Sequence, residues 1–205
     1  MKVLDNPLLN RFVKKLCNQP YIGQSNYVII LCLCLMASAC GIRPLTRIER
    51  SYIETHIPQQ AQALIKAEVL PNQAPLTSLE LIRVLFSSHP LLKERLPNPL
   101  TPGELMASGI RRPGQGQVGD LIIFKNLSRT LDYAVIIKVI SPTRYQAIGI
   151  LLGKVKQIEI DLAHPQARRN QTEIINTAIR PIKSFDQAPY LYLAGSLFSE
   201  FRSLF

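Results

Sequence analysis

The middle of the chain, from residue 120 onward, is built of short apolar runs separated by turn residues. Four of these runs are rich in β-branched residues: 120–125, 133–140, 145–151 and 155–162. Pro142-Thr143 separates the second run from the third, and Gly153-Lys154 separates the third from the fourth. Runs of this length and composition predict consecutive strands joined by tight turns. A fifth strand is predicted over 176–182, after the arginine-bearing loop HPQARRNQ.

Helical spacing characterises the chain before and after these strands. Apolar residues recur at three- and four-residue steps over 46–70, a helix that Pro58 is expected to break or kink. Thr77 and Glu80 have the spacing of a capping box, which predicts the start of a second helix. Leucines and phenylalanines at helical spacing over 189–205 predict a closing helix. N-terminal helices, an antiparallel sheet of about five strands and a C-terminal helix together make an α+β fold.

An uncharged segment of 13 residues, Tyr27–Ala39, directly precedes Cys40. A membrane-spanning helix needs roughly 20 apolar residues, whereas the apolar region of a signal peptide is shorter and follows positive charge. Upstream lie four basic residues and one acidic residue: Lys2, Arg11, Lys14 and Lys15, with Asp5. The segment therefore has the length and flank of a signal peptide; an uncleaved short anchor helix is the alternative.

The stretch Ala37-Ser38-Ala39-Cys40-Gly41 resembles a bacterial lipobox. The resemblance implies a signal peptide over 1–39, lipidation of the Cys40 thiol, a tether over 40–45 and a folded domain over 46–205. Acyl chains contribute about 0.8 kcal/mol per buried methylene, so two or three chains give stable anchoring. Gly41 resembles the residue at this position in lipoproteins sent to the outer membrane, so we expect a periplasm-facing protein of the cell envelope.

Charge and composition limit the classes of molecule that the protein is expected to bind. The formal net charge is +10, which favours anionic partners such as lipid headgroups or carboxylate-bearing polymers. No nucleic-acid partner is expected, because no binding motif accompanies the charge. All four cysteines lie within the first 40 residues, and tryptophan is absent, which excludes a sugar-binding groove built on that residue. We expect no metal and no cofactor, because His56, His89 and His164 are too widely separated for metal-ligand spacing.

The stretch Gly119-Asp120-Leu121-Ile122-Ile123-Phe124, together with the order and spacing of the elements around it, resembles the cell-wall peptidases of the NlpC and CHAP type. These enzymes have a papain-like fold, and the stretch matches their Gly-Asp strand. Tyr133-Ala134-Val135-Ile136-Ile137 stands where they have a strand that opens with the catalytic histidine, and 78–83 stands where they have the cysteine-bearing helix. The run 162–170 is similar to a loop of some bacterial members, and the resemblance covers roughly 46–205.

The resemblance places Ser78, Tyr133 and Gly149 at the three catalytic positions. A serine hydroxyl needs a strong base beside it, and a tyrosine phenol with an ordinary pKa near 10 does not act as one at neutral pH. Gly149 has no side chain to orient a base. We therefore expect no catalytic residues and no enzymatic activity. Taken without the resemblance, Ser78 is simply the start of a capped helix and Tyr133 an aromatic residue at a strand start, while Asp120 is expected to accept hydrogen bonds in a turn.

The expected function is a binding or scaffolding module for peptidoglycan or for an envelope protein. Arg111, Arg112, Arg168 and Arg169 are candidates for an anion-binding rim, although a solvated loop face would look the same. Two alternatives stay open. One is an active hydrolase that uses Ser78 with a displaced histidine such as His164, and the other is a lipoprotein subunit of an envelope complex.

Overall fold

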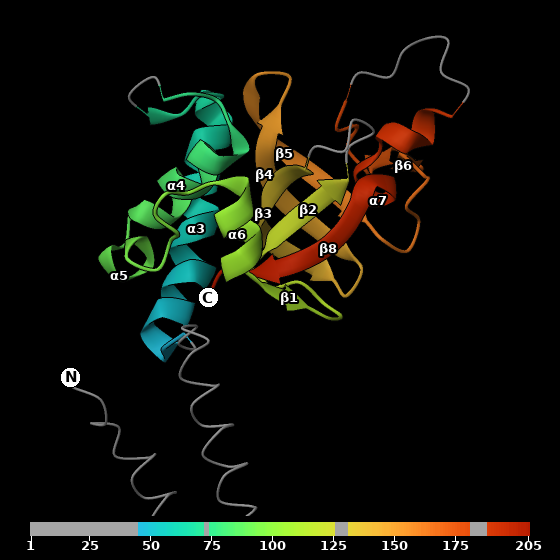
Figure 1. The fold of residues 1–205 in the computed structure, drawn as a ribbon. Coiled ribbons are helices and arrows are strands. Elements are labelled where there is room, and N and C mark those ends of the chain that lie inside the picture. Colours follow the sequence, from blue (N-terminus) through green and yellow to red (C-terminus); the bar gives the residue numbers. More distant parts are fainter. Residues whose placement is uncertain (1–44, 72–73, 126–130, 181–187) are drawn as a thin grey trace, which may run out of the picture. The chain divides into compact units, whose positions relative to one another are not determined.

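A six-stranded antiparallel sheet lies at the centre of the computed structural model, with the strand order β1-β8-β2-β3-β4-β5 (Figure 1). The strands are β1 (Ile110–Arg112), β2 (Leu121–Lys125), β3 (Leu131–Ser141), β4 (Arg144–Leu151), β5 (Lys154–Asp161) and β8 (Phe198–Ser203). A separate small hairpin pairs β6 (Arg169–Asn170) with β7 (Glu173–Ile174). The predicted α+β class is confirmed, and the sheet is one strand wider than expected.

The structure describes residues 45–71, 74–125, 131–180 and 188–205. These belong to one compact unit, Pro44–Phe205. The predicted signal peptide, the lipobox with Cys40 and all but the last residue of the tether lie outside the described residues.

The four central strands are confirmed, because β2 to β5 follow one another as a meander with neighbouring strands paired. The predicted fifth strand over 176–182 is wrong in its described part, where Ala178 forms a single bridge to Leu193. The segment runs alongside β5 without a continuous ladder; its Thr177 N–H donates to the Glu159 carbonyl at 2.9 Å.

The predicted C-terminal helix over 189–205 is also wrong. The described part of this segment forms a 3₁₀ turn, η2 (Pro189–Tyr192), a four-residue helix, α7 (Ala194–Leu197), and then strand β8. Residues four apart share a face of a helix, but they also share a face of a strand, because four is a multiple of the two-residue strand repeat. The spacing of Leu197 and Phe201 therefore fits both structures, and pairing with β1 and β2 selects the strand.

Within the described residues, four helices precede β2: α3 (Arg47–Ala67), α4 (Ser78–Ser87), α5 (Pro90–Lys93) and α6 (Pro102–Ser108). Helix α3 begins with a capping box in which Thr46 and Glu49 bond reciprocally. Contrary to expectation, α3 continues through Pro58 without a break. The predicted start of α4 is confirmed, since the Thr77 hydroxyl accepts from the Glu80 N–H at 3.1 Å.

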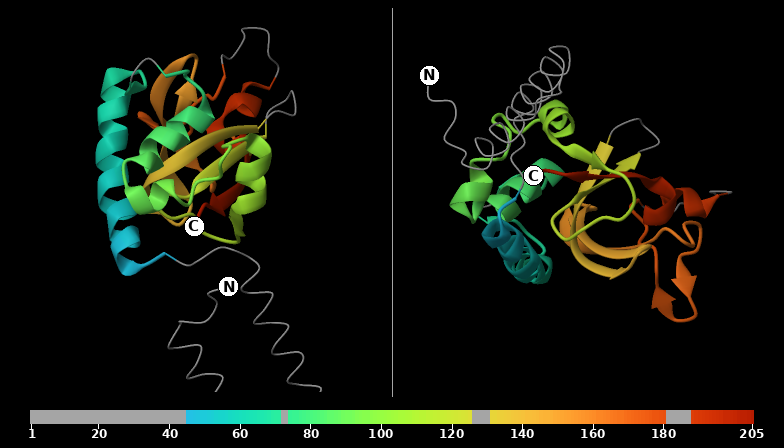
Figure 2. Two further views of the ribbon diagram at one scale, coloured as in Figure 1. Left: turned by 60° about the vertical axis from the view of Figure 1, so that its left-hand side comes forward. Right: turned by 90° about the horizontal axis from the view of Figure 1, so that it is seen from below.

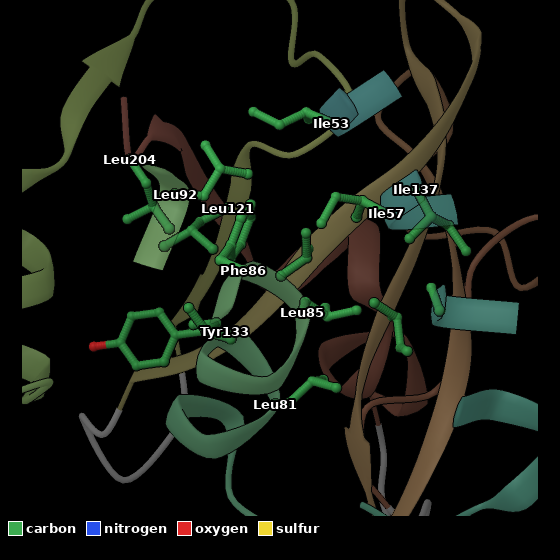
Figure 3. Close-up of a cluster of buried hydrophobic side chains, with 14 of the residues drawn as sticks. Ile53, Ile57, Leu81, Leu85, Phe86, Leu92, Leu121, Tyr133, Ile137 and Leu204 are labelled. Carbon is green, nitrogen blue, oxygen red and sulfur yellow. The ribbon is translucent and has the colours of Figure 1, made fainter. Parts of the chain in front are cut away.

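The sheet has an apolar core on each face, and it is strongly curved (Figure 2). On one face, α3 and α4 pack against alternate strand residues, including Leu121 and Tyr133 (Figure 3). On the other face, α7 and Phe201 pack against their neighbours in the strands, such as Ile122 and Ala134. Alternation along each strand divides the apolar residues between these two cores.

Candidate functional site

Tyr133, the residue at the base position, lies near the start of β3 and faces the helices. Its side chain is 5% exposed and packs in the same core as Leu81 of α4 (Figure 3). Its hydroxyl is buried and has no hydrogen-bond partner in the described part of the chain. Burial raises the pKa of the phenol, and the Asp132 carboxylate raises it further, against an opposing effect of Arg202. The phenol is therefore protonated and neutral at pH 7 and cannot accept a proton as imidazole does.

Ser78 is the first residue of α4 and is half-buried. Helices α3 and α4 are antiparallel, because Gln60 Nε2 donates to the Val84 carbonyl while Tyr52 bonds to Ser88. Ser78 therefore lies toward the C-terminal end of α3. The β4–β5 turn lies at the same end, since the Val155 N–H donates to the Glu68 carbonyl at 3.1 Å.

Gly149 does not share a face of the sheet with Tyr133. It is paired with Ala134, and a Cβ added to Gly149 would lie 2.6 Å from Ile158 Cδ1, in the core on the face opposite α3 and α4. The residue of β4 that shares the face of Tyr133 is Ile150, which packs against the helix-side core. The structure therefore does not bring the three catalytic positions together on one face. The β4 residue beside Tyr133 on the face of α3 and α4 is the apolar Ile150.

The Gly-Asp motif shapes a tight turn before β2. Gly119 has φ of +88°, and a Cβ there would lie 2.4 Å from Ile53 Cγ2, so both the backbone and the approach of α3 require glycine. Asp120 accepts from the Gln117 N–H at 2.8 Å, which confirms its predicted role as a turn acceptor. Burial raises the pKa of Asp120, although the Gln117 N–H and the nearby Arg112 favour its charged form.

The histidines are distributed over two regions. His164 lies beyond β5, with its Nδ1 3.2 Å from an Asp161 oxygen. Strand β5 runs from the end of the molecule that holds Ser78 toward Asp161, a span of seven residue steps or roughly 23 Å. Ser78 and His164 are therefore at opposite ends of the strands and do not form a pair.

The other two histidines meet around one tyrosine, which sequence reasoning missed. The Tyr52 ring stacks on His56 with centroids 4.3 Å apart, and His89 lies at the same distance with a tilted ring. His89 Nδ1 is buried and has no hydrogen-bond partner among the described residues. The four-residue spacing of Tyr52 and His56 in a helix could have predicted that these two rings lie together. The position of His89 beside them depends on how α3 and α4 pack, which the sequence does not show.

The four candidate arginines do not form one rim. Arg111 and Arg112 lie on edge strand β1, beside an open pocket that also contains Glu200. Arg111 Nε is 3.0 Å from Glu200, and Arg112 Nε is 2.7 Å from Asp120. That Nε–H points past the Asp120 carboxylate, so it makes an ion pair without a hydrogen bond, while Nη2 donates to the carboxylate at 3.3 Å.

Arg168 and Arg169 belong to the β6–β7 region, which lies apart from β1 (Figure 1). Both are exposed and form no ion pair in the described part of the chain. Their charges are therefore available to an anionic partner, whereas those of Arg111 and Arg112 are already paired within the domain.

Among the described residues, no group of three or more histidine, cysteine or acidic side chains is placed to hold a metal ion. Within the same described ranges, none of the helices has the length and apolar character needed to span a bilayer. Comparisons of the sequence with known protein families and with characterised proteins, and of the fold with solved structures, find no significant match. The resemblance to NlpC and CHAP peptidases stays a prediction.

Proposed function

We propose that this chain is a lipid-anchored protein of the bacterial cell envelope whose domain is a catalytically inactive relative of the NlpC and CHAP peptidases. In this proposal the papain-like domain is a binding or scaffolding module, and Cys40 carries the anchor. Peptidoglycan, or an envelope protein, is the partner.

The observation that carries the proposal is the environment of Tyr133. A peptidase of this type needs a proton acceptor at that position. Tyr133 instead offers a buried hydroxyl with a raised pKa, packed against the apolar face of α4. Ile150 is the apolar helix-side neighbour of Tyr133, and His164 lies at the far end of β5, so the described residues near Ser78 provide no histidine for it.

Binding to an anionic polymer follows from the charge. After removal of residues 1–39 the chain keeps 20 basic and 13 acidic residues, and this net charge of +7 attracts carboxylates over a distance comparable to the Debye length, about 8 Å at physiological ionic strength. Arg168 and Arg169 are exposed at the β6–β7 hairpin and form no ion pair with the described residues, whereas Glu200 already neutralises Arg111. Replacing both Arg168 and Arg169 with glutamine should therefore weaken binding to peptidoglycan more than replacing Arg111.

The test uses the full chain, purified in non-ionic detergent and incubated with intact peptidoglycan sacculi. We expect the protein to sediment with the sacculi and to release no soluble muropeptides, as measured by chromatography. Ser78→Ala serves as the matched variant and should behave like the wild type. Release of muropeptides by the wild type that Ser78→Ala abolishes would contradict the proposal in favour of a serine hydrolase.

Affinity purification from detergent-solubilised membranes separates the two classes of partner. Recovery of glycan with the protein supports the peptidoglycan module. Recovery of one stoichiometric protein without any glycan binding supports the alternative of a complex subunit. Cys40→Ser should prevent lipidation, so mass spectrometry of the mature N-terminus checks the anchor independently of either partner.

A further inference from the structure

Exposed apolar side chains extend from the end of the domain where α3 begins. Ile48, in the first turn of α3, is 75% exposed, and Val139 and Ile140, near the end of β3, are 38% and 40% exposed. Single apolar side chains on a surface are common and need no partner. Their position relative to one another, to the neighbouring charges and to Cys40 decides whether these three have a shared role.

The contacts of Gly119 show that Ile48 and Ile140 lie at the same end. A Cβ on Gly119 would be 2.4 Å from Ile53 Cγ2 of α3, and the Gly119 N–H donates to the Ile136 carbonyl of β3 at 2.9 Å. From this level Ile48 lies about 8 Å back along α3, and Ile140 lies about 13 Å onward along β3. Helix α3 ends beside the β4–β5 turn, where β3 begins, so the start of α3 and the end of β3 point the same way, downward in Figure 1. We call this the tether end.

Two basic side chains stand next to the exposed apolar ones. Arg47 and Lys138 are exposed and form no ion pair within the described part of the chain. Glu49, the acidic residue of the same helical turn as Arg47, is 1% exposed and is already paired inside the domain. At the opposite end of α3, by contrast, Glu68 pairs with two lysines of β5. Apolar groups beside unpaired cations therefore distinguish the tether end from the other.

The length of the tether limits how far this end can lie from a membrane. Leu45 is five positions after Cys40, so the extended chain between them spans at most about 18 Å. Helix α3 has 21 residues and is roughly 32 Å long, so its far end is nearly twice that distance from Leu45. This step rests on the proposed lipid anchor at Cys40, which holds one end of the tether at the bilayer.

We propose that the tether end docks on an anionic lipid bilayer. Ile48, Val139 and Ile140 enter the boundary between the headgroups and the acyl chains. Arg47 and Lys138 pair with lipid phosphates. Apolar side chains next to basic ones suit an interfacial contact with an anionic membrane, and the basic residues add to the hold of an acyl chain. Docking fixes the orientation of the domain, so the end that holds the β4–β5 turn faces away from the membrane.

Tryptophan fluorescence tests the proposal, because the chain contains no tryptophan and each variant therefore carries a single reporter. Ile48→Trp and Ile140→Trp place the reporter at the tether end. Val69→Trp, at a position that is 55% exposed just beyond the far end of α3, is the matched control. The full chain, purified in non-ionic detergent, is reconstituted into vesicles of phosphatidylcholine and phosphatidylglycerol, with and without bromine on the acyl chains. We expect brominated lipid to quench the emission of Ile48→Trp and Ile140→Trp at least about threefold more strongly than that of Val69→Trp.

The role of the cations is tested in the Ile48→Trp background. Arg47→Gln combined with Lys138→Gln should reduce quenching in the anionic vesicles by about twofold or more, to the level seen with phosphatidylcholine alone. Lys66→Gln combined with Lys125→Gln is the control with an equal change of charge, because both lysines are exposed at the opposite end of the domain. Quenching in this control should change by less than about a fifth.

Equal quenching of Ile48→Trp and Val69→Trp would overturn the inference, as would equal effects of the two charge-changing pairs. A blue-shifted emission of Ile48→Trp that grows with protein concentration and that brominated lipid does not quench would also overturn it, in favour of contact between two copies of the chain. Mass spectrometry of Cys40 on the same preparations reports on the anchor separately. An acylated protein without preferential quenching overturns only the docking, and an unacylated protein with preferential quenching contradicts only the proposed anchor.

Discussion

The two ends of strands β3 to β5 differ in how their buried polar groups are satisfied. At the end near Asp161, Asn176 is fully buried and makes four hydrogen bonds: from the N–H groups of Asp161 and Gly195, and to the carbonyls of His164 and Ala167. Tyr145 at this end donates its hydroxyl to the Pro142 carbonyl at 2.5 Å. We call this the closed end.

At the opposite, open end, the Tyr133 hydroxyl is buried without a partner among the described residues, and Leu152 is strained and exposed. The ion pair of Asp132 and Arg180 is widely spaced, and a pocket lies beside it. Natural proteins depart from local rules mainly at functional sites. The contrast predicts that substitutions of buried polar groups cost more stability at the closed end than at the open end.

The largest effect is expected from Asn176→Ala at the closed end. The substitution leaves two buried N–H groups and two carbonyls without their partner, and each unsatisfied group costs about 1–3 kcal/mol. Because solvent and local relaxation recover part of this, we expect the free energy of unfolding to fall by about 4 kcal/mol. Urea denaturation followed by circular dichroism measures the change.

Asn170→Ala on the exposed β6 strand is the control for Asn176→Ala. It should change the free energy of unfolding by less than about 0.5 kcal/mol. Equal effects of the two substitutions would show that the Asn176 network does not hold the closed end together.

A matched pair of tyrosine substitutions compares the two ends directly. Tyr145→Phe removes the hydrogen bond to Pro142 and should lower the free energy of unfolding by about 1 kcal/mol. Tyr133→Phe removes a buried hydroxyl that has no partner in the described chain, so it should raise the same quantity by up to about 1 kcal/mol. Thermal and urea unfolding of both variants measure whether each substitution raises or lowers the free energy of unfolding. A loss of stability in Tyr133→Phe equal to that in Tyr145→Phe would remove the contrast between the ends.

The sequence predicted the parts of the fold that depend on local pattern. Strands β2 to β5 are confirmed because their turns join neighbours in the chain, and the start of α4 is confirmed because a cap acts within four residues. The pairing of β1 with β8 joins residues that are about 90 positions apart, as Ile110 with Ser203, and no local signal marks it. Pairings of this kind are decided by the packing of the whole domain.

The candidate site shows the same limit. Spacing assigned Gly149 to the third catalytic position, but a shift of one residue along a strand reverses the face on which a side chain lies. The register shift between Ile136 and Lys138 in β3 is of the kind that spacing alone cannot locate. Asp132 and Arg180 were not proposed together, since β3 and the segment after β7 meet only in the folded chain.

The smallest expected effect tests the backbone of Leu152 at the open end. Asparagine adopts positive φ more readily than leucine, so Leu152→Asn should raise the free energy of unfolding by about 0.5–1 kcal/mol. Gln171→Asn, at the other described exposed position with similar φ, should stabilise the fold by a similar amount. Urea denaturation of both variants measures the change, and a Leu152→Asn protein no more stable than the wild type would show that the positive φ of Leu152 carries no strain.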